Sequence, residues 1–374
     1  MTSALRRLAP SRLMLGAYVP ARTATWPERS RLFVVGDDFG WSIDDDRARL
    51  TATASRLGYD VAPAHWARFA RHQSVFHHDH FGALQGGWLE SSHRLGLSYF
   101  HGRPGTPGYP EFDRAYETLQ SHSGRIERVQ VTHAEMHELV IAAGVDPQKV
   151  FRIPIGVELA RFPHGDPERR RGAREAHGIP GAAFVVGSFL KDGVGLGAGL
   201  EPKLVKGPDT LVAVLDRVRA AVPELFVLLT GPARGYVRNA LEERDIPHRH
   251  VQLRSRDELA GAYHSLDVSL VTSRQEGGPK AVLESMATGV PLVTTRVGQA
   301  SELVIDGENG LLADVDDADA LAAAVMRVHD DAGLSEGLRA AGRPTAEEHA
   351  EERLDSRWAE LLDGFVRRGS PRAG

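Results

Sequence analysis

Two glutamates, Glu276 and Glu284, stand eight positions apart where an apolar run, residues 267–272, gives way to a helical pattern. Pro279 suits the first turn of that helix, because its missing N–H costs nothing there. Glu276 then lies in the loop before the helix, and Glu284 lies about one and a half turns inside it. A carboxylate accepts two hydroxyl hydrogen bonds at once, so the pair predicts a site for sugar or ribose diols.

Two glycines, Gly277 and Gly278, separate the first of these carboxylates from the helix. Without side chains they let a ligand approach the bare backbone. The free N–H groups of the helix start favour an anion such as a diphosphate. The segment therefore predicts a ligand that carries both hydroxyl groups and phosphate.

The two glutamates resemble the motif of two glutamates separated by seven residues in the retaining glycosyltransferases of family 4, which have the GT-B fold. The resemblance continues through GVPLV at 289–293, VGQASELV at 297–304 and DGENGLL at 306–312. An ordered set of motifs is far more specific than a carboxylate pair alone. It implies that Glu284 accepts the ribose hydroxyls of a nucleotide sugar and that Glu276 binds hydroxyls of the sugar. Gly277, Gly278 and Pro279 would line the sugar and the diphosphate.

The same family implies fixed cations for the diphosphate, which lower the barrier to its departure without a metal or another cofactor. Lys206, followed by Gly207, resembles the Lys-Gly element of the family. The usual Arg is missing, because Gly187 is followed by Ser188. Lys191 is the nearest cation and is predicted to replace it, although a lysine lacks the bidentate fork of arginine.

The stretch 192–202, between those two lysines, is rich in glycine and formally satisfies the G-x-G-x-x-A pattern of dinucleotide sites. No helix opens after it, because Pro202 intervenes. We therefore predict a mobile loop beside the phosphates rather than a dinucleotide site.

In the first half of the chain, His101 lies just past a predicted strand, and the resemblance implies that it hydrogen-bonds the donor sugar. His133 ends the next strand and is either a helix cap or an acceptor contact. Gly40 is the candidate for close backbone approach to the donor, and Trp41 for stacking on a sugar face. Arg254 is predicted to lie near the nucleotide base.

Two other clusters have structural explanations. The acids of 44–46 could be mistaken for an Asp-x-Asp metal site, but their position fits a helix start, where acids complement the helix dipole. The histidines near Asp79, between residues 72 and 80, lack the spacing of a zinc site and a second ligand cluster. No metal is predicted.

A chain of 374 residues is longer than one hydrophobic core usually supports, so two domains are expected. From residue 31 onward apolar runs alternate with helical patterns, which predicts an α/β protein with parallel sheets. With the resemblance, the prediction is GT-B architecture: two Rossmann-like domains whose parallel sheets face one another across a cleft. Residues 1–156 would form the acceptor-side domain and 157–345 the donor domain, and a C-terminal helix within 346–374 would cross back to the first domain.

The charge and composition of the chain limit the partners and the compartment that are expected. The net charge of −5 argues against a nucleic-acid partner. The absence of cysteine excludes disulfides and fits a reducing compartment, so a cytoplasmic chain is expected. No apolar run approaches the length of a membrane span. The first 27 residues contain four arginines and no acid. Such a basic segment can touch anionic lipid at the inner membrane face, although its composition favours disorder or a surface strand.

The sequence thus predicts a retaining hexosyltransferase that uses a nucleotide-diphosphate sugar and a hydroxyl acceptor: a polysaccharide, a glycolipid or a natural-product glycan. One alternative is another GT-B enzyme, such as a nucleotide-sugar epimerase or a phosphorylase. The other is a non-catalytic nucleotide-sugar-binding subunit, which Ser188 at the place of the usual Arg keeps open. Nucleotide base, sugar and oligomeric state are left open by the sequence.

Overall fold

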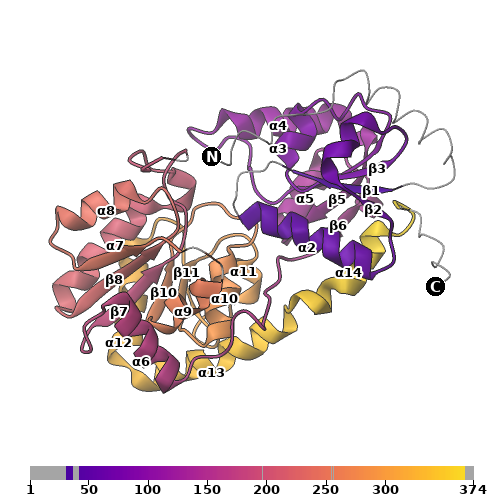
Figure 1. The fold of residues 1–374 in the computed structure, drawn as a ribbon. Coiled ribbons are helices and arrows are strands. Elements are labelled where there is room, and N and C mark those ends of the chain that lie inside the picture. Colours follow the sequence, from indigo (N-terminus) through magenta and orange to yellow (C-terminus); the bar gives the residue numbers. More distant parts are fainter. Residues whose placement is uncertain (1–30, 37–41, 196, 254, 256, 367–374) are drawn as a thin grey trace, which may run out of the picture. The chain divides into compact units, whose positions relative to one another are not determined.

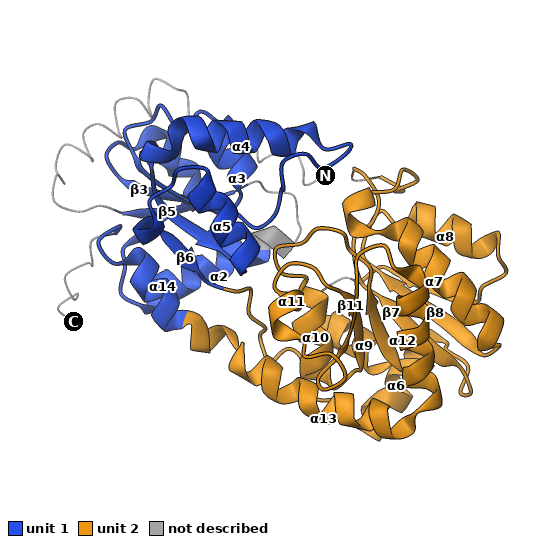
Figure 2. Cartoon of the chain, turned by 180° about the vertical axis from the view of Figure 1, so that it is seen from behind, with its two compact units in different colours: residues 1–153, 355–374 blue, residues 154–354 orange. Residues whose placement is uncertain are grey.

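The computed structural model describes residues 31–36, 42–195, 197–253, 255 and 257–366 (Figure 1). The chain divides into two compact units. Residues 1–153 and 355–374 form unit 1, and residues 154–354 form unit 2 (Figure 2). Gly40, Trp41 and Arg254 lie outside the described residues.

Unit 1 contains a parallel sheet with the strand order β2-β1-β3-β4-β5-β6. The direction of winding reverses between β1 and β3, and open α/β sheets bind ligands at the carboxyl ends of strands at such a point. The strands are β1 (Leu32–Val35), β2 (Val61–Ala62), β3 (Ser74–His77), β4 (Arg94–Ser98), β5 (Ile126–Val131) and β6 (Val150–Arg152). The α-helices are α2 (Ser42–Arg56), α3 (His80–Gln85), α4 (Pro110–His122), α5 (Ala134–Ala142) and α14 (Asp355–Leu362).

Unit 2 contains a second parallel sheet, in the order β12-β11-β10-β7-β8-β9, with its reversal between β7 and β10. The strands are β7 (Phe184–Ser188), β8 (Leu225–Thr230), β9 (His248–Val251), β10 (Val268–Val271), β11 (Leu292–Thr295) and β12 (Leu311–Ala313). The α-helices are α6 (Pro167–His177), α7 (Pro208–Ala221), α8 (Gly235–Glu242), α9 (Asp257–His264), α10 (Lys280–Thr288), α11 (Ala300–Leu303), α12 (Ala318–Asp330) and α13 (Ala332–Glu348). The short 3-10 helix η5 (Leu204–Lys206) precedes α7.

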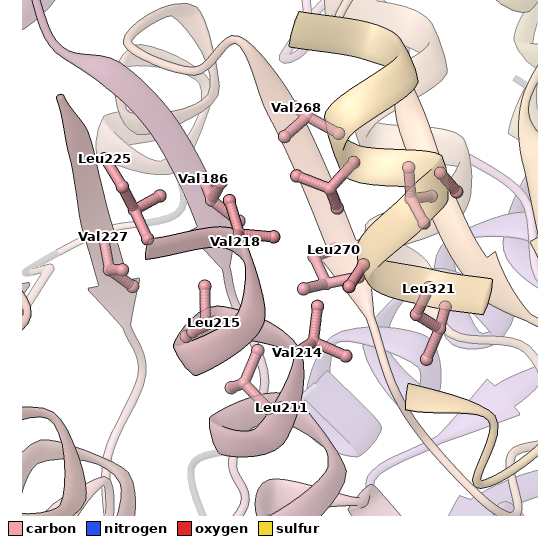
Figure 3. Packing of buried hydrophobic residues seen from close by; sticks show 14 of the residues in the cluster. Val186, Leu211, Val214, Leu215, Val218, Leu225, Val227, Val268, Leu270 and Leu321 are labelled. Atoms are coloured by element: carbon pink, nitrogen blue, oxygen red, sulfur yellow. The ribbon is translucent and has the colours of Figure 1, made fainter. Parts of the chain in front are cut away.

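The core of unit 2 shows why α7 forms where it does. Its apolar residues Leu211, Val214, Leu215 and Val218 follow helical spacing, and each is at most 1% exposed. They face β7, β8 and β10, as Figure 3 shows. Burying one such side chain contributes about 1.5–3 kcal/mol, so this stripe fixes the helix on the sheet. The start of α7, next to the candidate site, is thereby fixed too.

The C-terminal segment differs from the single long helix that the sequence predicts. α13 ends at Glu348 and α14 begins at Asp355, with a 3-10 turn between them. Ala350 forms a parallel bridge with Val157. The N–H of Val157 donates to the carbonyl of His349 at 3.1 Å. Since the backbone groups of this stretch are used by residue 157, the helix cannot continue through it.

Strand β4, which the sequence places directly before His101, covers Arg94–Ser98 and ends three residues before that histidine. Helices α3, α8, α11 and most of α13 were not predicted. The first three are short, and α3 begins from the cap Asp79, which accepts hydrogen bonds from the N–H groups of Phe81 and Gly82. Short helices leave a weak periodic signal, so side-chain caps of this kind are the better sequence marker.

Candidate functional site

The candidate site of unit 2 lies at the carboxyl ends of β7 and β10, where the sheet reverses its winding. Lys206 ends η5, which follows β7, and Glu276 follows β10. Lys206 Nζ donates a hydrogen bond to Glu276 Oε1 at 2.5 Å, and Ser273 Oγ donates to the same oxygen at 2.8 Å. The side chains of Lys206 and Glu276 are 21% and 9% exposed. Two residues far apart in the sequence therefore form one half-buried ion pair.

Gly207 places the lysine in this position. Its φ is +61°, in the left-handed region that favours glycine. A Cβ atom here would lie 1.9 Å from the carbonyl oxygen of Thr272, and the Thr272 hydroxyl donates to the carbonyl of Gly207 at 2.9 Å. The chain must therefore pass between η5 and α7 in direct backbone contact with the end of β10. Steric contact with Thr272 therefore explains why a glycine follows Lys206.

Arg274 is a site residue that sequence reasoning missed. Its guanidinium donates two hydrogen bonds of 2.7 Å to the carboxylate of Asp209 and one of 2.6 Å to Asp316. It also donates to the carbonyl of Leu204 at 2.7 Å. Asp209 lies in the first turn of α7, so Arg274 ties the loop of Glu276 to the start of that helix. Its sequence signal was only an Arg two residues before the first glutamate.

Glu284 lies in α10 and is 5% exposed. Its Oε2 accepts a hydrogen bond of 3.0 Å from the hydroxyl of Tyr263 in α9. Pro279 precedes α10 as its N-cap residue rather than standing in the first turn, and no side chain caps this helix start. Among the described residues, therefore, no side chain caps the start of α10.

The two glycine-containing loops around Glu276 pack backbone against backbone. A Cβ on Gly278 would lie 2.5 Å from the side chain of Gln299, and a Cβ on Gly298 would lie 2.4 Å from the carbonyl oxygen of Glu276. Gln299 N–H donates to the Gly277 carbonyl at 2.9 Å. The Gln299 side chain is buried and bonds both backbone groups of Ile155, at 2.9 and 3.0 Å. Gln299 was not predicted as a site residue, yet it holds the loop of Glu276 in place.

The end of β7 differs from the family pattern, as the sequence indicated. Ser188 is its last residue. Lys191 follows shortly after, and burial lowers its pKa. Arg234, which sequence reasoning missed, lies fully buried against Ser188 and donates to its carbonyl at 2.7 Å. A cation therefore lies beside the position of the missing arginine, but it comes from the loop after β8.

The glycine-rich stretch forms a closed loop. Gly193 and Pro202 make an antiparallel bridge, and the N–H of Lys203 donates to the carbonyl of Asp192 at 2.7 Å. The carbonyls of Ala198 and Gly199 accept hydrogen bonds of 2.8 Å from the first N–H groups of α8. No α-helix follows the loop directly, since the next element is the 3-10 helix η5. The loop thus supplies the hydrogen-bond acceptors for the first N–H groups of α8.

In unit 1, His101 lies in the loop after β4, beyond its last residue Ser98. Its ring lies edge-on to that of His80, with the centroids 5.8 Å apart. His80 is buried and stacks on Tyr99. Burial holds the pKa of His80 well below its usual 6.5, and the nearby His101 lowers it further. His80 is therefore neutral near pH 7.

His133 is buried and occupies the N-cap position of α5 without a side-chain cap hydrogen bond. Its Nδ1 lies 2.9 Å from the Thr132 hydroxyl, and its Nε2 lies 3.8 Å from Glu135. The nearby His133 and Arg103 keep the pKa of Glu135 below its usual value. Of its two predicted roles, the structure supports the position of a cap but not the cap hydrogen bond.

Among the described residues, no group of three or more His, Cys, Asp or Glu could hold a metal ion. Asp79, within the histidine-rich stretch, is used to cap α3. A search of the described helices found none that is long and apolar enough to cross a membrane.

Part of the chain is similar to a known family and to known proteins. Residues 194–331 match the family Glycosyl transferases group 1. The chain is 31% identical over 216 residues to D-inositol 3-phosphate glycosyltransferase of Pseudarthrobacter chlorophenolicus. The aligned region covers 56% of this chain and 48% of that protein. The chain is also 31% identical over 250 residues to the protein of the same name from Acidothermus cellulolyticus, with 63% and 51% covered. The chain thus spans about half the length of the curated relatives it matches.

Solved structures share the fold of both units. Anabaena HepE in complex with UDP and glucose superposes with a TM-score of 0.72 at 15% identity, over 90% of this chain and 99% of that one. Sucrose-phosphate synthase of Thermosynechococcus elongatus superposes with a TM-score of 0.65 at 19% identity, over 86% and 77%. Residues 194–331 thus match the family Glycosyl transferases group 1, and the two parallel sheets have the GT-B fold of these solved structures.

Proposed function

We propose that this protein transfers a hexosyl group from a nucleotide-diphosphate sugar to a hydroxyl acceptor, with retention at the anomeric carbon. The observation that carries the proposal is the Lys206–Glu276 pair, 2.5 Å apart at the reversal point of the unit 2 sheet. Glu284 is buried on the helix that follows Glu276. One cation and two carboxylates are the groups that a diphosphate, a sugar and a ribose need.

Each residue has a role in this proposal. Lys206 Nζ leaves Glu276 and faces the diphosphate, where negative charge builds as the glycosidic bond breaks. Glu276, released from the lysine, accepts hydroxyl hydrogen bonds from the sugar, and Glu284 accepts those of the ribose. The departing phosphate oxygen assists attack by the acceptor on the same face, so neither a covalent nucleophile nor a metal is required. His101 keeps its predicted role as a hydrogen-bond partner of the donor sugar.

The first donor to test is a UDP-hexose with a polyol acceptor. The structural neighbour HepE has been seen with UDP and glucose and with UDP-glucose. The relatives that match this chain carry the name D-inositol 3-phosphate glycosyltransferase, so a phosphorylated polyol heads the acceptor series. Gly40, Trp41 and Arg254 keep their predicted roles in the loop near the phosphates and near the base.

The deciding experiment is calorimetric binding of nucleoside diphosphates and their sugars to the native chain and to Glu284→Ala. The control is Glu308→Ala, which removes an exposed carboxylate of the same unit. Binding of one base that is lost only in Glu284→Ala fixes the donor. Turnover with an acceptor in the presence of EDTA, with the anomeric configuration of the product read by NMR, then tests transfer, metal independence and retention. Absence of binding by every nucleotide overturns the proposal.

A second candidate, a non-catalytic nucleotide-sugar-binding subunit, is favoured by one observation: Ser188 stands where the resembling family has its phosphate-binding arginine. Such a subunit binds the donor normally and turns over no acceptor. An epimerase gives a third outcome in the same assay, because it converts the donor without any acceptor.

A further inference from the structure

Arg234 is the largest fully buried side chain of the described residues, and its surroundings are unusual. One terminal nitrogen, Nη1, donates to the carbonyls of Ser188, Leu190 and Thr230, at 2.7, 2.6 and 3.0 Å. The other, Nη2, donates to the hydroxyl of Ser188 at 3.2 Å. Ser188 and Thr230 are the last residues of the adjacent strands β7 and β8. The guanidinium therefore joins two strand ends at the edge of the sheet where ligands bind.

One carboxylate accompanies this cation. Asp192 Oδ2 lies 3.0 Å from Arg234 Nη2, and the two side chains are 2% and 0% exposed. Within the described part of the chain, neither oxygen of Asp192 has a hydrogen bond of normal geometry, and neither does Nε of Arg234. A buried ion pair is fully compensated only when its remaining polar atoms are also satisfied. The pair is therefore held by charge rather than by a closed hydrogen-bond network.

The electrostatics of this pair extend to its neighbours. Burial raises the pKa of Asp192, although Arg234 opposes the shift. Burial also lowers the pKa of His250, and the charge of Arg234 lowers it further. Because buried charges are poorly screened, the field of Arg234 acts beyond the groups that it touches.

The pair lies at the position where the resembling family has an arginine that this chain lacks. The resemblance places an arginine directly after Gly187, and this chain has Ser188 instead. The hydroxyl and the carbonyl of that serine are both held by Arg234. A positive charge at the end of β7 thus comes from another element, and its guanidinium is fully buried.

We propose that Arg234 supplies from beneath β7 the fixed positive charge that Ser188 does not provide, and that Asp192 limits the strength of this charge at the diphosphate. The inference rests on the proposed donor site. Arg234 does not touch the donor; it positions the ends of β7 and β8 and acts on the phosphates through its field. Nη1 and Nη2 are engaged by Ser188, Leu190, Thr230 and Asp192, so the guanidinium is held by the protein rather than offered to a phosphate.

The test measures binding of UDP and of uridine by calorimetry to the native chain and to Asp192→Asn, Arg234→Met and Arg234→Lys. In Asp192→Asn the arginine loses its counter-charge, so UDP should bind about three- to tenfold more tightly, while uridine, which has no phosphate, is unaffected. Arg234→Met should weaken UDP about tenfold, again without an effect on uridine, and Arg234→Lys should restore part of the loss.

A purely structural role gives a different pattern. Removing either partner of a structural pair lowers stability and weakens UDP and uridine together. Thermal unfolding and circular dichroism of each variant identify any that does not fold. Should Arg234→Met fail to fold, Asp192→Asn still decides, because unchanged or weaker UDP binding in that folded variant overturns the inference. If the native chain binds neither UDP nor any other nucleoside diphosphate, the proposed function falls as well; if it binds UDP and Asp192→Asn does not tighten it, only this inference falls.

Discussion

Replacing Glu276 by glutamine tests whether this carboxylate serves the sugar or the nucleotide. In the structure its Oε1 accepts from both Lys206 and Ser273, at 2.5 and 2.8 Å. Glutamine keeps the shape and one acceptor oxygen but removes the negative charge. If Lys206 must leave Glu276 to meet a diphosphate, the native carboxylate competes with the phosphate for the lysine. The substitution should therefore help UDP and harm the sugar part of the donor.

The magnitude follows from the pair itself. A hydrogen bond to a charged group contributes about 1.5–3 kcal/mol net. Lys206 retains 21% exposure, so the low end of that range applies. UDP should then bind Glu276→Gln about 1–2 kcal/mol more tightly, which corresponds to about 5- to 30-fold. For UDP-glucose, the loss of charge-assisted bonds to sugar hydroxyls is of similar size, so its affinity should change little.

Titration calorimetry of UDP and UDP-glucose against both proteins gives the ratio of the two dissociation constants. The advantage of UDP-glucose over UDP should shrink about 5- to 30-fold in the variant. Arg217→Met is the matched control, since it removes an exposed cation of α7 that pairs with Asp319. Equal weakening of both ligands in Glu276→Gln would refute the reasoning, because it would show that the carboxylate only holds the loop or contacts the nucleotide.

Three further outcomes are expected. Glu284→Ala should weaken UDP by about 2–4 kcal/mol, since two ribose hydroxyls lose a charged acceptor, whereas Glu308→Ala should leave calorimetric binding unchanged. Asp267→Asn should lower the free energy of unfolding in urea by about 2–3 kcal/mol, because this carboxylate accepts from two arginines and a backbone N–H; the exposed Asp319→Asn should cost less than about 0.5 kcal/mol. Stability should fall as the pH drops below about 6.5, since burial depresses the folded pKa of His80 and the unfolded state then binds more protons. In His80→Phe the slope of unfolding free energy against pH should decrease by up to about 1.4 kcal/mol per pH unit, and an unchanged slope would show that other groups carry it.

The local part of the candidate site could be predicted from the sequence. The strand before Glu276, the helix that carries Glu284 and the left-handed Gly207 after Lys206 each have a signal within a few residues: an apolar run, a helical period and a Lys-Gly pair. Such signals depend on neighbours in the chain, so a single sequence contains them. That Lys206 and Glu276 form an ion pair follows only from the order of the strands.

The residues that were missed owe their roles to contacts across the sheet. Arg234 binds Ser188, Arg274 binds Asp209, and Gln299 binds Ile155. Although Gln299 and Arg274 lie in or next to segments that the sequence singles out, no local signal identifies the partner of any of the three, because each partner is distant in the sequence. Burial makes the difference, because a buried guanidinium or amide must find acceptors and its position then fixes theirs. The structure is needed to identify them.

The loop between Ser188 and Lys206 closes on itself and leaves the lysine in place. The N–H of Lys203 donates to the Asp192 carbonyl at 2.7 Å, so the two ends of the loop are held together. Because the entropy of loop closure grows only slowly with length, the glycine-rich stretch adds little to the cost of positioning Lys206. Asp192 begins this loop and also pairs with Arg234. The same residue therefore closes the loop and pairs with the cation at the end of β7.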